Sequence, residues 1–139
     1  MIIAVDFDGT IVEHKFPEIG KELPFAIKTL KLFQEKGHKL ILWTYRSGEE
    51  LKEAVDFCKE RGLHFHAVNN SYEGEEFDNS YSRKIYADLY IDDRNILGIP
   101  DWEELYNKLA GKNAEDNSTD ESKDRPEKTS AFKKIFQFR

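Results

Sequence analysis

The sequence predicts an α/β protein with a doubly wound, mainly parallel sheet. Two observations support this fold class. Short apolar segments alternate with segments of helical periodicity through the first 111 of the 139 residues. The apolar segments at residues 1–5 and 39–43 are almost uninterrupted by polar residues, which is typical of parallel strands covered on both faces. Strands that alternate with helices favour parallel pairing through helical crossovers.

Each expected element has its own signal. Four strands are expected, at residues 1–5, 39–43, 63–68 and 87–91. Three helices are expected, at residues 24–37, 47–62 and 101–109. Every helical segment carries apolar residues three and four positions apart, so each is expected to bury one face.

Start and stop residues set the bounds of the helices. Pro24 precedes the first amphipathic segment and Gly37 follows it, which is the usual order of these two residues around a helix. Ser47 and Glu50 have the spacing of a capping box at the start of the second helix. Asp101 is expected to cap the third helix in the same way.

The composition changes near Gly111 and divides the chain into three parts. Residues 1–111 are expected to form one folded domain. Residues 112–130 mix both charge signs with almost no apolar residues and are predicted to be a disordered polar linker. Residues 131–139 form a basic aromatic segment, in which Phe132, Ile135 and Phe136 have helical spacing. Such a segment would contact a partner or an anionic membrane surface, or remain a plain tail.

Composition also excludes some classes of function. The formal net charge of −6 argues against general nucleic-acid binding, because phosphate backbones are bound by clustered Lys and Arg. No apolar run approaches the roughly 18 to 20 residues that span a bilayer, so no transmembrane segment is predicted. The single cysteine, Cys58, cannot form an internal disulfide, and the protein is expected to be cytoplasmic.

Polar residues gather where the expected strands end. Asp6 and Asp8 follow the first strand, Thr44 follows the second, and Asp92 and Asp93 follow the fourth. Ligands of doubly wound sheets bind at the carboxyl ends of the strands, so these residues are predicted to form one site. Several carboxylates at close range require a cation, and oxygen ligands favour a hard ion such as Mg²⁺.

These segments together resemble the haloacid dehalogenase superfamily of phosphohydrolases, over about residues 1–110. Its first motif corresponds to residues 6–10, DFDGT, and its second to the strand that delivers Thr44. Its third motif, a basic residue, is best matched by Lys84, with Arg83 as the neighbouring alternative. Its fourth motif corresponds to the paired Asp92 and Asp93. The resemblance implies a Rossmann-like sheet and phosphatase activity.

The resemblance also implies a role for each side chain. Asp6 would attack phosphorus and form an aspartyl phosphate, and Asp8 would act as general acid and base. Thr44 and Lys84 would bind the phosphoryl group. Arg46 belongs to none of these motifs, and it would reach a substrate phosphate or carboxylate, or cap its own helix region.

A Mg²⁺ ion is implied as the cofactor. Its expected ligands are Asp6, the backbone carbonyl of Asp8, Asp92, and Asp93 directly or through water. The second aspartate, Asp8, favours hydrolysis of phosphate esters over carbon-halogen cleavage.

The intervals between the motifs leave no room for a cap domain. A capless member of this superfamily has an open site, which goes with a bulky or macromolecular substrate or with a homo-oligomer whose neighbour covers the site. The phosphorylated substrate, small or macromolecular, is not identified by these residues. Two alternatives to a phosphatase remain: a phosphotransferase, and a binding module of the same fold that acts through its C-terminal tail.

Overall fold

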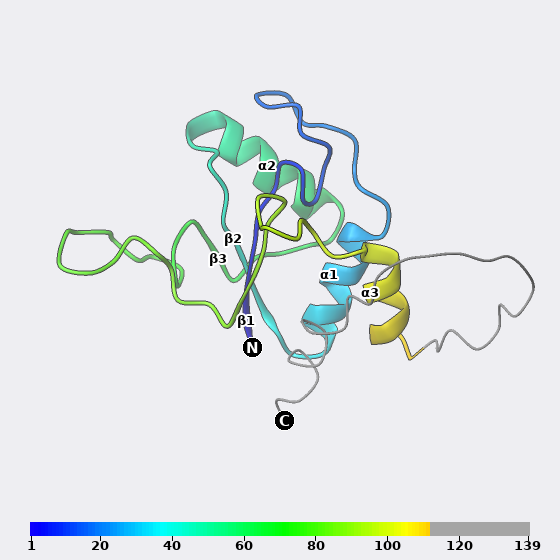
Figure 1. The fold of residues 1–139 in the computed structure, drawn as a ribbon. Coiled ribbons are helices and arrows are strands. Elements are labelled where there is room, and N and C mark those ends of the chain that lie inside the picture. Colours follow the sequence, from blue (N-terminus) through cyan, green and yellow to red (C-terminus); the bar gives the residue numbers. More distant parts are fainter. Residues whose placement is uncertain (112–139) are drawn as a thin grey trace, which may run out of the picture.

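Figure 1 shows the protein as a computed structural model, which describes residues 1–111. The elements follow in the order β1 (Ile2–Val5), α1 (Ala26–Glu35), β2 (Lys39–Leu42), α2 (Gly48–Glu60), β3 (Ala67–Val68), β4 (Leu89–Ile91) and α3 (Trp102–Leu109). The predicted linker at residues 112–130 and the basic aromatic segment at 131–139 lie outside the described residues. Among residues 1–111, no helix is long and apolar enough to cross a membrane.

The four strands form one parallel sheet in the order β3-β2-β1-β4. Val5, the last residue of β1, pairs with Leu42 at the end of β2 and with Ile91 at the end of β4. Three strands therefore end at the same level, and the residues that follow them start side by side. The predicted α/β class with a parallel Rossmann-like sheet and no cap domain is confirmed.

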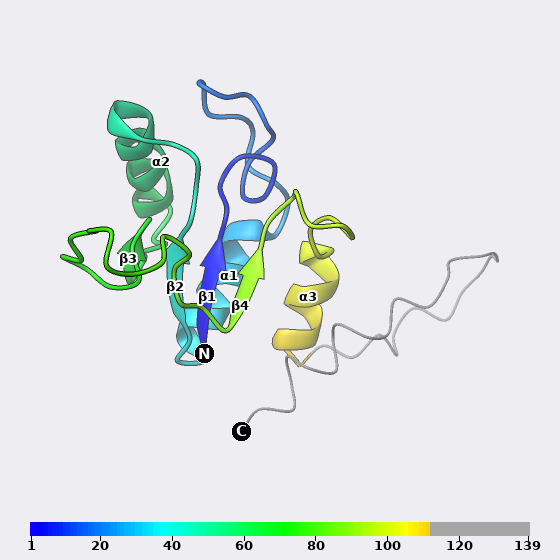
Figure 2. The same cartoon turned by 60° about the vertical axis from the view of Figure 1, so that its left-hand side comes forward.

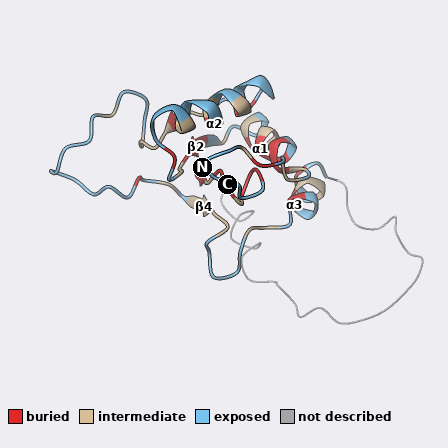
Figure 3. Ribbon diagram, turned by 90° about the horizontal axis from the view of Figure 1, so that it is seen from above, coloured by how far each residue is buried: buried red, intermediate tan, exposed pale blue. Residues whose placement is uncertain are grey.

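The two faces of the sheet are covered differently. Apolar side chains of α1, α2 and α3 pack on one face in a single core with Ile3, Val5 and Leu42, and Figure 2 shows the three helices around that side of the sheet. The other face is covered around Ile85, which belongs to the connection between β3 and β4. That connection contains no helix, and its outer part projects from the body as an exposed loop (Figure 3).

The expected bounds are close to the observed ones, with three differences. β3 comprises only Ala67 and Val68, which pair with Ile41 and Leu42 of β2, so residues 63–66 of the expected strand lie outside it. α1 begins after Phe25, whose backbone is left-handed with φ 64°, so Pro24 lies outside the helix. Ser47 is the N-cap of α2 but makes no side-chain capping hydrogen bond, so the capping box was wrong. The predicted cap of α3 is confirmed, since Asp101 accepts from the backbone N–H of Glu104.

Candidate active site

Three aspartates converge at the carboxyl edge of the sheet. Asp6 directly follows β1, and Asp92 and Asp93 directly follow β4. One carboxylate oxygen from each of the three lies within 4.8 Å of the other two. This convergence follows from the register, because Val5 and Ile91 end their strands as a pair. It agrees with the prediction that these residues form one site.

The Asp6 carboxyl group is the most perturbed of the three. Burial, together with smaller contributions from the charges of Asp92 and Asp93, raises the pKa of Asp6 from 3.8 to about 6. The Thr10 hydroxyl donates to Asp6 Oδ2 at 3.3 Å and accepts from the backbone N–H of Asp93 at 2.9 Å. Thr10 therefore connects the loop after β1 to the loop after β4.

Gly9 allows these two loops to meet. Its backbone has φ +84°, and a Cβ at this position would lie 2.3 Å from Asp93 Oδ2. A side chain would therefore both strain the backbone and displace the Asp93 carboxylate. The roles of Gly9 and Thr10 in the cluster were not predicted, although both residues lie within the recognised DFDGT segment.

The donor set fits a hard divalent cation. All three groups offer carboxylate oxygens, which are the ligands that Mg²⁺ prefers. The pKa of Asp6 is raised mainly by burial and to a smaller extent by the charges of Asp92 and Asp93, and a cation at the cluster would stabilise the ionised form.

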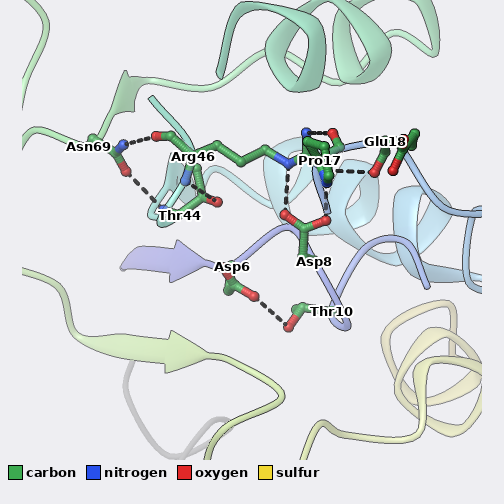
Figure 4. A network of polar contacts seen from close by, with 8 residues as sticks. All are labelled: Asp6, Asp8, Thr10, Pro17, Glu18, Thr44, Arg46 and Asn69. Carbon is green, nitrogen blue, oxygen red and sulfur yellow. Dashed lines mark hydrogen bonds and ion pairs between the residues drawn. The ribbon is translucent and has the colours of Figure 1, made fainter. Parts of the chain in front are cut away.

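The Asp8 carboxylate takes no part in this cluster and instead forms a buried ion pair, while the role of the Asp8 backbone carbonyl as a Mg²⁺ ligand stays a prediction. Arg46 donates from Nε to Asp8 Oδ2 at 2.7 Å and from Nη2 to Asp8 Oδ1 at 2.8 Å. The arginine also donates to the carbonyl oxygens of Pro17 at 2.8 Å and Glu18 at 2.9 Å. Figure 4 shows that the Asp8 carboxylate points to Arg46, whereas Asp6 points to Thr10.

The expectation that Arg46 contacts a substrate phosphate is therefore wrong for this conformation, and the alternative that it caps its helix is wrong as well. Its residue exposure is only 1%, and four of its five N–H groups donate to Asp8, Pro17 and Glu18. The guanidinium also lies near two aromatic rings, 5.1 Å from the centroid of Phe7 and 5.2 Å from that of Phe16. Arg46 thus fastens Asp8 to Pro17 and Glu18 in the flap, as we call residues 13–23 of the connection between β1 and α1.

Thr44 is held in place by Asn69, which follows β3. The backbone N–H of Thr44 donates to Asn69 Oδ1 at 2.8 Å, and Asn69 Nδ2 donates to the carbonyl oxygen of Arg46 at 3.3 Å. Asn69 has a positive φ of 53°, a conformation that asparagine tolerates better than most residues. The sequence offered no signal for this role beyond the position of Asn69 at a strand end.

The two candidates for the third motif lie in different places. Lys84 Nζ lies 5.3 Å from the ring centroid of Tyr90, and Tyr90 packs on the face of the sheet that the helices leave uncovered. Within residues 1–111, Lys84 forms no ion pair with Asp6, Asp92 or Asp93, and its role in the site stays a prediction. Arg83 instead lines a cavity that also contains Thr44.

Among solved structures, the chain is similar to a conserved protein from Bacteroides thetaiotaomicron. The two sequences are 56% identical, the TM-score is 0.72, and the match covers 81% of this chain and 92% of that protein. The chain belongs to the family of that conserved protein. Members of this conserved-protein family therefore share the α/β fold described here. No model of a protein family and no curated protein matches the chain.

Proposed function

We propose that the protein is a Mg²⁺-dependent phosphatase of the haloacid dehalogenase superfamily, which hydrolyses a phosphate monoester. The observation that carries the proposal is the convergence of Asp6, Asp92 and Asp93 at the carboxyl edge of the sheet. Thr44 lies just after β2, the strand that pairs with β1, which Asp6 follows. The proposed nucleophile, the candidate metal site and the proposed hydroxyl donor therefore follow strands that end at one edge of the sheet.

Asp6 is the proposed nucleophile. One of its carboxylate oxygens forms a bond to phosphorus while the bond from phosphorus to the ester oxygen breaks, and water later hydrolyses the aspartyl phosphate. Thr10 holds Asp6 Oδ2 by a hydrogen bond of 3.3 Å, which orients the other oxygen for attack. Thr44 donates its hydroxyl to a phosphoryl oxygen.

Asp6, Asp92 and Asp93 would hold the Mg²⁺ ion. The bound ion would supply positive charge against the carboxylates and the phosphoryl oxygens, which otherwise repel one another.

Asp8 is the proposed general acid and base. In the described conformation both of its oxygens accept hydrogen bonds from Arg46. Proton transfer to the leaving oxygen therefore requires one of these bonds to be exchanged for a contact with the substrate. Arg46 acts through Asp8 in this scheme, as a positioning residue.

The test is phosphate release from a broad panel of phosphate esters, with Mg²⁺ and with chelator, by wild type and Asp6→Asn. Turnover that needs Mg²⁺ and is lost in the variant supports the proposal. An Asp6→Asn variant with wild-type turnover would show that another group attacks phosphorus. Transfer to an added alcohol instead of water would favour the phosphotransferase. Absence of turnover by a folded chain that binds Mg²⁺ would favour the binding module.

A further inference from the structure

A cavity of about 270 Å³ lies beside Thr44, at the carboxyl edge of β2 and β3. Its walls include Trp43 and Thr44 after β2, Asn69 after β3, and Arg83 from the connection that leads to β4. Thr44 is shared between this cavity and the proposed phosphoryl site. The group attached to a phosphate bound by Thr44 would therefore reach directly into the cavity.

The volume favours a small molecule. Pockets for drug-sized ligands occupy roughly 300 to 1,000 Å³, so a cavity of about 270 Å³ suits a metabolite of fewer atoms.

The loop that forms the outer wall is held together by its own polar groups. Asn70 Nδ2 donates to the carbonyl oxygen of Glu75 at 3.2 Å, and the backbone N–H of Ser71 donates to Glu75 Oε2 at 2.6 Å. Tyr81 donates its hydroxyl to the carbonyl oxygen of Glu76 at 2.8 Å. Most polar groups of this wall are therefore already hydrogen-bonded to the loop itself.

Arg83 differs from the other polar groups of this wall. Its guanidinium lies 4.2 Å from the ring centroid of Phe77, and Tyr81 contacts the same ring in a T-shaped arrangement at 5.4 Å. Within residues 1–111 the Arg83 side chain forms no ion pair and no hydrogen bond. A guanidinium that lies over a ring keeps its N–H donors at its edges, where they match the two oxygens of a carboxylate.

We propose that this cavity binds the leaving group of a small phosphate monoester, and that Arg83 binds a carboxylate of that group. The inference rests on the proposed phosphatase function and names the substrate class: a phosphorylated carboxylic acid of metabolite size. Arg83 is the cationic side chain among the residues that line the cavity. Glu75 also lines it, and its carboxylate accepts from the Ser71 backbone N–H.

Two esters of the same carbon skeleton test the inference. Glycerol 3-phosphate and 3-phosphoglycerate differ at one terminal carbon, which is a hydroxymethyl group in the first and a carboxylate in the second. The kcat/KM of wild type should be at least tenfold higher for 3-phosphoglycerate, because a bidentate contact with Arg favours the carboxylate. In Arg83→Gln this ratio should fall towards one, mainly through KM, and Arg83→Lys should be intermediate. Lys59→Gln removes an exposed cation of α2 and should keep the wild-type ratio.

Several outcomes would overturn the inference. A ratio that is unchanged in Arg83→Gln would show that Arg83 does not bind the carboxylate. An equal loss for both esters would assign Arg83 to the phosphate itself. Failure of wild type to hydrolyse either ester, or p-nitrophenyl phosphate, with Mg²⁺ would instead contradict the proposed function. In that case the affinities of the two esters, measured by calorimetry, test the cavity separately. Tighter binding of 3-phosphoglycerate that is lost in Arg83→Gln supports the inference, and equal or absent binding rejects it.

Discussion

Replacing Asp6 by Asn should stabilise the metal-free protein while abolishing its turnover. The pKa of Asp6 rises from 3.8 to about 6 on folding, chiefly because the carboxyl group is buried. Each pKa unit corresponds to about 1.4 kcal/mol, so the shift corresponds to about 3 kcal/mol. Asp6 is only partly buried, and solvent screening lowers the expected effect to about 1–2 kcal/mol.

The pH dependence gives this prediction its sign. Above pH 6 the ionised Asp6 carboxylate destabilises the folded state relative to the unfolded state. As the pH falls from about 6 to 3.8, the folded state binds the proton first and this penalty disappears. Asparagine is neutral throughout, so its advantage over aspartate should be largest above pH 6 and vanish below about 3.8.

Urea unfolding in the presence of chelator measures the effect, with the free energy of unfolding of both chains followed across this pH range. Asp56→Asn on the exposed side of α2 is the control, and should change that free energy by less than about 0.5 kcal/mol. Mg²⁺ should reverse the order, because wild type gains about 2.7 kcal/mol at a hundredfold excess over Kd. A metal-free Asp6→Asn chain that is less stable than wild type at neutral pH would refute the reasoning.

Three further predictions concern Arg46, Gly9 and Cys58. Arg46→Met should lower the free energy of unfolding by roughly 3–5 kcal/mol, because it leaves Asp8 buried without its partner, and urea unfolding should show partial recovery when Asp8→Asn is added. Gly9→Ala should weaken Mg²⁺ binding in calorimetry, since the new Cβ would lie 2.3 Å from Asp93 Oδ2; unchanged affinity would mean that Asp93 is not a ligand. Burial raises the pKa of the Cys58 thiol to about 12, so a disulfide reagent at neutral pH should label the folded chain very slowly and the chain in guanidinium completely.

The strand ends explain why the acidic cluster was predictable. Asp6 and Asp92 each follow an apolar segment, and parallel strands bring such positions together whatever the connections between them. The amphipathic spacing of α1 and α3 likewise identified their buried faces, which include Phe33 and Leu105.

The partner of Asp8 was not predictable in this way. Arg46 lies 38 residues further along the chain, and its position depends on the backbone carbonyls of a flap without regular periodicity. The sequence could not decide between Arg83 and Lys84 for a similar reason. The two residues are adjacent, and only the path of the irregular connection from β3 to β4 turns one to the cavity and the other to Tyr90.

The two tryptophans of the chain stand on either side of the site. Trp102 donates its indole N–H to the carbonyl oxygen of Thr10 at 2.9 Å, and the Thr10 hydroxyl contacts Asp6. Trp43 lines the cavity beside Thr44. The protein thus carries a natural fluorophore for each half of the site: Trp43→Phe would leave emission that reports on the cation, and Trp102→Phe would leave emission that reports on the organic part of the substrate.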